Sequence, residues 1–138
     1  MIYLLDLNYT LVDKEKDAPR IRPMELQIEL ETYRQWLIDM LKGHYVILIT
    51  ARPVEYKWQT LERIETLTGF KPNEAYFAEI RSYPHVKKEH LLRSYVLPNY
   101  NPLGLFAIES NPKTRAMYTK YGIKSAPAID DFGNRISI

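Results

Sequence analysis

Short apolar runs of strand length alternate along this chain with segments of helical periodicity. The runs are apolar at successive positions, as strands buried on both faces of a parallel sheet require. Strands are predicted over residues 2–7, 45–49, 75–80, 103–108 and 123–129. Because helical segments separate them, the pattern predicts an α/β fold with three layers: a Rossmann-like, doubly wound parallel sheet of five strands with right-handed crossovers.

Four helices are predicted between these strands from apolar residues spaced three or four apart. The first is one continuous helix, with its apolar face made by Leu26, Leu30, Tyr33, Leu37 and Leu41. The second opens at Pro53, ends at Gly69 and buries Val54, Trp58, Leu61 and Ile64. The third covers roughly residues 84–96. The fourth begins at the capping pair Asn111-Pro112 and ends at Gly122.

Composition narrows the class of protein. The chain has 138 residues, 46% of them hydrophobic and 26% charged, which suits a single globular domain over residues 1–138. The absence of cysteine excludes a disulfide scaffold, a thiolate zinc site and a cysteine nucleophile. The net charge of +2 is too small to argue for nucleic-acid binding by itself. The opening MIYLLDLNY lacks a basic segment and is interrupted by Asp6, so we expect neither a signal peptide nor a membrane helix, but a cytoplasmic protein.

Polar residues stand where the predicted strands end, and ligands of doubly wound sheets bind beyond those carboxyl ends. These residues are Asp6 and Asn8, Thr50 and Arg52, and Glu109 and Ser110, with the pair Lys87-Lys88 preceding the fourth strand. A carboxylate can attack phosphorus, two carboxylates can hold Mg²⁺, and a hydroxyl with a guanidinium can bind phosphoryl oxygens. No glycine-rich phosphate loop is present, which excludes Walker-type and dinucleotide-binding sites.

Four short motifs, in order, resemble those of the haloacid dehalogenase superfamily. Asp-Leu-Asn-Tyr-Thr-Leu at 6–11 resembles its first motif, usually Asp-x-Asp-x-Thr, and Ile-Leu-Ile-Thr-Ala-Arg-Pro at 47–53 resembles its second. Lys87-Lys88 suits the third motif, and Phe-Ala-Ile-Glu-Ser-Asn at 106–111 resembles the fourth. The Thr50-x-Arg52 pair and the run from Lys88 through Glu109 are especially similar to the 3'-phosphatase domain of phage polynucleotide kinase. The motifs span nearly the whole chain.

The resemblance implies a role for each matching residue and Mg²⁺ as the cofactor. Asp6 is implied as the nucleophile that becomes an aspartyl phosphate. Magnesium ligands are implied at Asp6, Glu109 and the backbone carbonyl of Asn8. The resemblance places Thr50 on the phosphoryl group and makes Lys88, with Lys87 as the alternative, the residue that neutralises charge. Thr10 and Arg52 are implied on the substrate side.

The sequence departs from the superfamily pattern at three positions. Asn8 stands where hydrolytic members have Asp, and an amide cannot act as general acid or base, which is typically worth about 100–10,000-fold in rate. Ser110 replaces a frequent second acid, and Tyr9 replaces the usual glycine. Residues 13–23 are too few for a cap domain, so an open site is expected.

Two functions therefore stay open. The first is a magnesium-dependent phosphatase or phosphotransferase that acts through Asp6 on a phosphorylated nucleotide or a nucleic-acid 3' end. The second is a catalytically weakened relative that binds a phosphate-bearing ligand or a protein partner, which Asn8 and Ser110 favour. Plainer interpretations also exist: Lys87-Lys88 as a solvated helix start, and Asp130-Asp131 as a turn.

Overall fold

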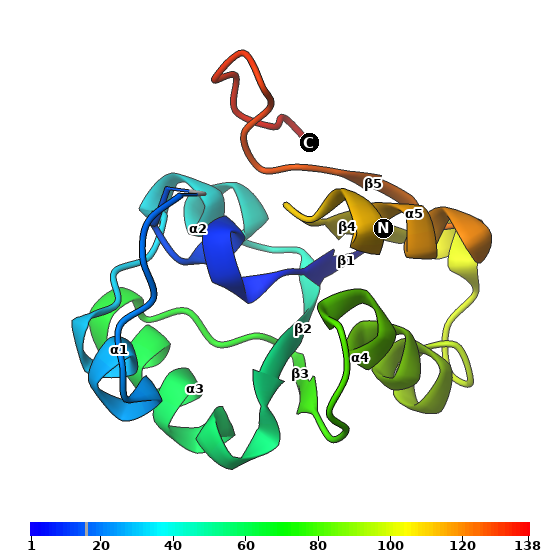
Figure 1. Ribbon diagram of the computed structural model, residues 1–138. Helices are drawn as coiled ribbons and strands as arrows, with labels where there is room; N and C mark the ends of the chain where they lie inside the picture. The colour runs from blue at the N-terminus through cyan, green and yellow to red at the C-terminus, as the bar shows by residue number, and fades with distance from the viewer. Residues whose placement is uncertain (16) are drawn as a thin grey trace.

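A five-stranded, all-parallel sheet forms the centre of the protein, as the sequence predicts. The computed structural model describes residues 1–15 and 17–138. The strands lie in the order β3-β2-β1-β4-β5, and β1 occupies the middle. Their bounds are β1 Ile2–Leu5, β2 Tyr45–Pro53, β3 Glu74–Ala78, β4 Leu105–Ile108 and β5 Lys124–Ala126. Figure 1 shows the sheet running through the molecule between the helices.

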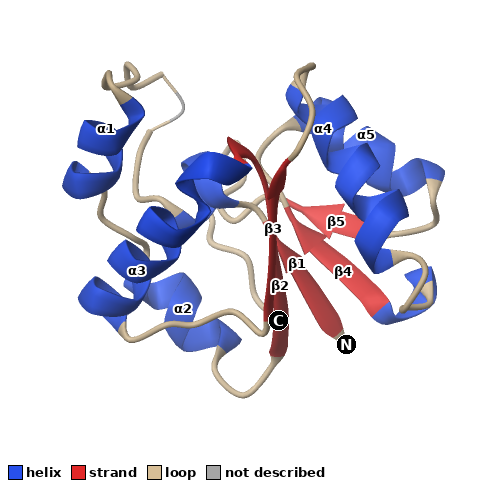
Figure 2. Cartoon of the chain, turned by 90° about the horizontal axis from the view of Figure 1, so that it is seen from below, coloured by secondary structure: helices blue, strands red, loops and turns tan. Residues whose placement is uncertain are grey.

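Helices cover both faces of the sheet, which makes the fold three-layered and Rossmann-like (Figure 2). One face carries α1 (Met24–Leu30), α2 (Gln35–Leu41) and α3 (Lys57–Thr68). The other carries α4 (Pro84–Leu91), which continues as a wider turn over Leu92–Val96, and α5 (Pro112–Lys120). Side chains alternate along β1, so that Leu5 packs with α2 and α3 while Leu4 packs with α4 and α5.

The prediction of one continuous helix from Leu26 to Leu41 is wrong. α1 ends at Leu30 and α2 begins at Gln35, with an extended segment between them. That segment hydrogen-bonds to the loop after β1: Tyr33 pairs with Val12, and the Arg34 N–H donates to the Leu11 carbonyl at 2.9 Å. Backbone pairing with this loop therefore outweighs the helical periodicity. The expected apolar face also fails in α1, because Leu26 and Leu30 are exposed.

The segment after β2 also differs from the prediction. β2 extends to Pro53, a short turn follows over Val54–Tyr56, and α3 begins only at Lys57. Val54 and Trp58, which the pattern placed on a buried face, are exposed, whereas Ile64 is buried as predicted. The pairing of β2 with β3 shifts register between Thr50 and Pro53, so β2 continues irregularly past the predicted end.

The remaining boundaries are close to the predicted ones. Asn111 caps α5 by accepting a hydrogen bond from the Lys113 N–H at 2.9 Å, with Pro112 at the first helical position. The fourth and fifth strands are shorter than predicted, partly because Pro102–Gly104 forms a helical turn. In the described part of the chain, no cap domain stands over the sheet and no helix is long and apolar enough to cross a bilayer.

Candidate active site

The candidate site lies at the carboxyl ends of the three central strands. In the register of the sheet, Leu5 of β1 pairs with Leu48 of β2 on one side and with Ile108 of β4 on the other. Asp6 and Glu109, the next residues of β1 and β4, therefore emerge at the same edge. A hydrogen bond from the Asp6 N–H to the Ile108 carbonyl at 3.0 Å holds the two chain segments together there.

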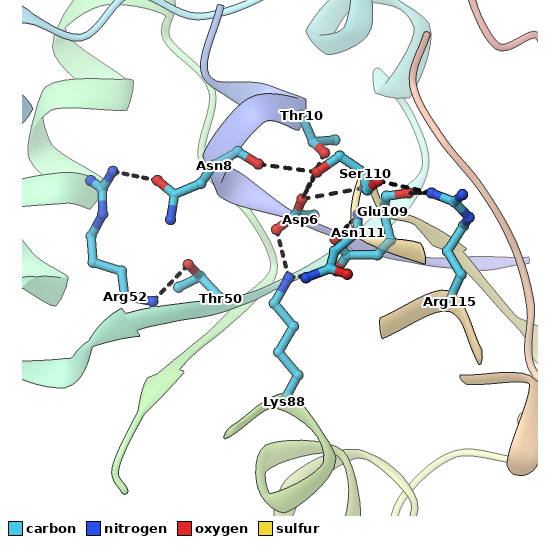
Figure 3. A network of polar contacts seen from close by, with 10 residues as sticks. All are labelled: Asp6, Asn8, Thr10, Thr50, Arg52, Lys88, Glu109, Ser110, Asn111 and Arg115. Carbon is cyan, nitrogen blue, oxygen red and sulfur yellow. Dashed lines mark hydrogen bonds and ion pairs between the residues drawn. The ribbon is translucent and has the colours of Figure 1, made fainter. Parts of the chain in front are cut away.

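Lys88 connects these two acids. It projects from α4, and its Nζ donates to Asp6 Oδ1 at 2.6 Å and to Glu109 Oε1 at 2.5 Å (Figure 3). All three side chains are nearly inaccessible to solvent, at 6% exposure or less. Burial lowers the pKa of Lys88, but the charges of Asp6 and Glu109 outweigh it and raise that pKa above its usual value. The lysine is therefore a buried cation.

The second oxygen of the Asp6 carboxylate also accepts hydrogen bonds. Thr10 Oγ1 donates to Asp6 Oδ2 at 2.7 Å and Ser110 Oγ donates to it at 3.0 Å. Burial raises the pKa of Asp6, but the charge of Lys88 and the hydrogen bonds that the carboxylate accepts lower it below its usual value. Asp6 is therefore an ionised carboxylate at neutral pH, held in one orientation from both sides.

Glu109 differs from Asp6 in its electrostatics. Burial and the negative charge of Asp6 raise the pKa of Glu109, against the opposing effect of Lys88. Its Oε2 accepts a hydrogen bond from the Asn111 N–H at 3.0 Å. Arg115 fixes the same loop from α5, donating to the carbonyls of Glu109 at 3.0 Å and Ser110 at 2.9 Å. Two acids and one lysine thus share a buried cluster, the Asp6–Lys88–Glu109 triad.

The loop after β1 forms one wall of the site. Tyr9 has a φ of +60°, the left-handed conformation that glycine adopts at least cost. Glycine is the usual residue at this position in the superfamily motif that residues 6–11 resemble. Arg34 secures this turn by donating to the carbonyls of Tyr9 at 2.9 Å and Thr10 at 2.8 Å. The turn brings the carbonyl of Asn8 to 3.4 Å from the Ser110 hydroxyl, beside Asp6.

A second group of polar residues surrounds Arg52. Its guanidinium donates to both oxygens of Glu31, at 3.0 and 2.5 Å, and to the amide oxygen of Asn8 at 2.9 Å (Figure 3 shows the Asn8 contact). Thr50 is fully buried, and its hydroxyl accepts from the Arg52 N–H at 3.1 Å. Because Thr50 lies in β2 next to the centre of the sheet, it lies between this group and the triad.

The structure separates the two lysines that the sequence left as alternatives. Lys88 lies in the triad, whereas Lys87 donates to the Ala51 carbonyl at 3.2 Å. Lys87 lines a neighbouring pocket of about 350 Å³, together with Asn8, Tyr9 and Arg52. Lys14 and Arg20 add further positive charge to the same pocket.

Sequence reasoning missed three supporting residues and was correct about a turn. Glu31 and Arg34 lie in the segment predicted as one continuous helix, and Arg115 lies in the fourth predicted helix; no motif marks any of them. The sequence predicts a turn at Asp130-Asp131. In the structure, the Asp130 side chain accepts hydrogen bonds from the N–H groups of Phe132 at 2.9 Å and Asn134 at 2.8 Å, as in a turn.

The oxygen donors beside Asp6 suit a magnesium ion. Within residues 1–15 and 17–138, no three His, Cys, Asp or Glu side chains come together as a metal-binding group. Mg²⁺ does not need such a group, since it commonly uses one or two carboxylates together with phosphate oxygens and water. The carboxylates of Asp6 and Glu109 and the carbonyl of Asn8 are hard oxygen donors of this kind. The set fits Mg²⁺, although Lys88 already provides one positive charge to the two acids.

The fold and the site together define a small Rossmann-like α/β protein with a buried acid–lysine–acid cluster at the carboxyl edge of its sheet. No protein-family model matches the sequence, and no curated protein matches it as a relative. A chain from the structure of the Pnkp1/Rnl/Hen1 RNA repair complex is similar in fold, with a TM-score of 0.71 and 16% sequence identity. The match covers 91% of this chain but only 41% of that one, so our chain corresponds to less than half of its length.

Proposed function

We propose that this chain is a phosphoryl-transfer protein of the haloacid dehalogenase type, with Asp6 as the nucleophile. The observation that carries the proposal is the buried Asp6–Lys88–Glu109 triad at the carboxyl ends of adjacent parallel strands. An ionised carboxylate held by Lys88 and Thr10 is oriented for attack, because its two oxygens are fixed on opposite sides. Perturbed acids in a Rossmann-like sheet at this edge are typical of functional sites.

In the proposed reaction, an oxygen of Asp6 attacks the phosphorus atom and the substrate oxygen leaves. Lys88 offsets negative charge on Asp6 and on the phosphoryl group as the aspartyl phosphate forms. The Thr50 hydroxyl accepts one backbone hydrogen bond and still has its own hydrogen to donate to a phosphoryl oxygen. Mg²⁺, held by Asp6, Glu109 and the Asn8 carbonyl, would shield the charge of the phosphate when bound.

The proposed substrate class is a phosphorylated nucleotide or a nucleic-acid 3' end. Three observations support it: the similarity of the Thr50-x-Arg52 motif to a polynucleotide 3'-phosphatase domain, the fold similarity to a chain of an RNA repair complex, and the charge of the neighbouring pocket. Lys14, Arg20 and Lys87 line that pocket, and positive side chains near a cleft attract phosphate-bearing chains.

Asn8 and Ser110 favour a second candidate function, a binding protein that retains the phosphate site without efficient hydrolysis. An amide at position 8 cannot protonate a departing alkoxide, so esters with poor leaving groups would be processed slowly. The leaving groups of acyl phosphates, anhydrides and aryl phosphates depart without that help. Efficient turnover of esters with poor leaving groups would therefore favour the first candidate over the second.

The test is magnesium-dependent phosphate release from a substrate panel by the wild type and the Asp6→Asn variant. The panel contains para-nitrophenyl phosphate, acetyl phosphate, nucleoside 3'- and 5'-monophosphates, ATP and a 3'-phosphorylated oligonucleotide. We expect turnover that Asp6→Asn abolishes. Turnover that persists in Asp6→Asn removes Asp6 as the nucleophile, whereas a wild type that binds inorganic phosphate without turnover supports the binding protein.

A further inference from the structure

Arg52 is buried but does not present a free charge to the site. Its exposure is 2%, and both of its terminal nitrogens are engaged by Glu31. Thr60 Oγ1 accepts a further hydrogen bond from it at 3.0 Å. An ion pair with two parallel hydrogen bonds fixes the plane of the guanidinium as well as its position. Arg52 is therefore held rigidly by residues outside the proposed catalytic group.

This arrangement determines which way the Asn8 amide faces. A guanidinium has only donors, so the group that Asn8 turns towards Arg52 must be its carbonyl oxygen, Oδ1, at 2.9 Å. The NH₂ group of the same amide then does not face the guanidinium, and in Figure 3 it points to the side of Thr50. Within the described chain, no group accepts a hydrogen bond from this NH₂, and Asn8 lines the pocket beside the site. Two donor hydrogens are thus available to a ligand.

Glu31 is itself held by surrounding donors. Gln27 Nε2 and Tyr33 Oη each donate to its carboxylate at 3.3 Å, in addition to Arg52. The break between α1 and α2 allows this, because it turns Glu31 inward to 5% exposure, whereas Glu29, two residues earlier in α1, is exposed. The break after α1 therefore places Glu31 where it holds Arg52, and Arg52 in turn orients the Asn8 amide.

We propose that Glu31 is a positioning residue that makes Asn8 a hydrogen-bond donor to an oxygen of a phosphate compound bound beside Asp6. The inference rests on the proposed phosphoryl site. In this role the Asn8 amide donates a hydrogen bond, which an ionised aspartate could not do, because a carboxylate only accepts hydrogen bonds. Without Glu31, Arg52 would be a buried cation without its counter-charge. The Asn8 amide would then no longer be held in one orientation.

The test follows the side-chain amide of Asn8 by nuclear magnetic resonance, so it does not depend on turnover. Its NH₂ signals are assigned by their loss in Asn8→Ala, and inorganic phosphate is titrated with Mg²⁺ present. In the wild type we expect these signals to shift to saturation. In Glu31→Gln we expect the shift to fall at least threefold and phosphate binding to weaken about five- to tenfold, which corresponds to one lost hydrogen bond. Glu29→Gln makes the same charge change at an exposed site and should match the wild type.

The outcomes separate this inference from the proposed function. If phosphate shifts backbone signals around Asp6 but not the Asn8 amide, or if Glu31→Gln behaves like Glu29→Gln, the positioning role is wrong and the phosphate site stands. If phosphate perturbs nothing near Asp6 in the wild type, both are wrong. Should Glu31→Gln fail to fold, Glu31→Asp keeps the charge and shortens its reach; it should lose part of the amide shift relative to Glu29→Asp, and an unchanged shift overturns the role.

Discussion

Replacing Lys88 with methionine should destabilise the protein strongly. Methionine fills a similar volume but leaves Asp6 and Glu109, both buried, without their shared positive charge. Removing one partner of a buried ion pair costs about 3–5 kcal/mol, because the remaining charge loses its compensation. Two acids lose their partner here, but Glu109, whose pKa is already raised, can take up a proton and relieve part of the cost, so we expect the lower part of that range. For a domain of this size, the melting temperature should fall by roughly 10–20 °C.

Magnesium should reverse part of this loss. We expect the ion to stabilise Lys88→Met more than the wild type, because it would supply the charge that the lysine provided. A concentration of about one hundred times the dissociation constant adds about 2.7 kcal/mol to the free energy of unfolding. Urea unfolding followed by circular dichroism, with and without MgCl₂, measures both effects. Calcium and sodium at matched ionic strength serve as ion controls.

Lys87→Met is the matched protein control. Lys87 is adjacent in sequence but only partly buried and makes one hydrogen bond, to the Ala51 carbonyl. Its loss should cost no more than about 1 kcal/mol. The prediction is wrong if the free energy of unfolding of Lys88→Met lies within about 1 kcal/mol of the wild-type value, or if Lys87→Met is equally damaging. Equal effects of Mg²⁺ on the wild type and Lys88→Met would remove the support for a magnesium site between the acids.

Three further predictions concern the walls of the site. Tyr9→Gly should be more stable than Tyr9→Ala by about 1 kcal/mol in urea unfolding, because glycine adopts the φ of +60° at this position at lower cost. A more stable Tyr9→Ala would refute the backbone strain. Arg34→Met should lower the free energy of unfolding by about 2–3 kcal/mol, since the carbonyls after β1 lose a charged donor. Arg81→Met, at an exposed position, is the control, and its free energy of unfolding should stay within about 0.5 kcal/mol of the wild-type value. Asn8→Asp should raise hydrolysis of nucleoside monophosphates relative to acetyl phosphate by about tenfold or more; an unchanged ratio means that a missing acid does not limit the reaction.

The sheet could be predicted from the sequence because each central strand is apolar on both faces and ends in a polar residue. Those ends also identified Asp6 and Glu109, which the parallel register places at one edge. The break after Leu30 could not be predicted, because helical periodicity continues across it. What interrupts the helix is pairing with residues 11–13, and a local pattern contains no information about a partner twenty residues away. Glu31 was missed for the same reason, since its partner Arg52 lies beyond the next helix, in β2.

The central position of β1 has a consequence for how the chain folds. β1 hydrogen-bonds to β2 and to β4, and its pairing of Ile2 with Leu105 joins distant parts of the sequence. Contacts between such distant residues form slowly, because the intervening chain loses entropy before the contact contributes. A fragment that ends before Leu105 keeps one edge of β1 unpaired, apolar and open to other strands. We therefore expect C-terminal truncations that remove β4 to aggregate rather than to retain a partly working site.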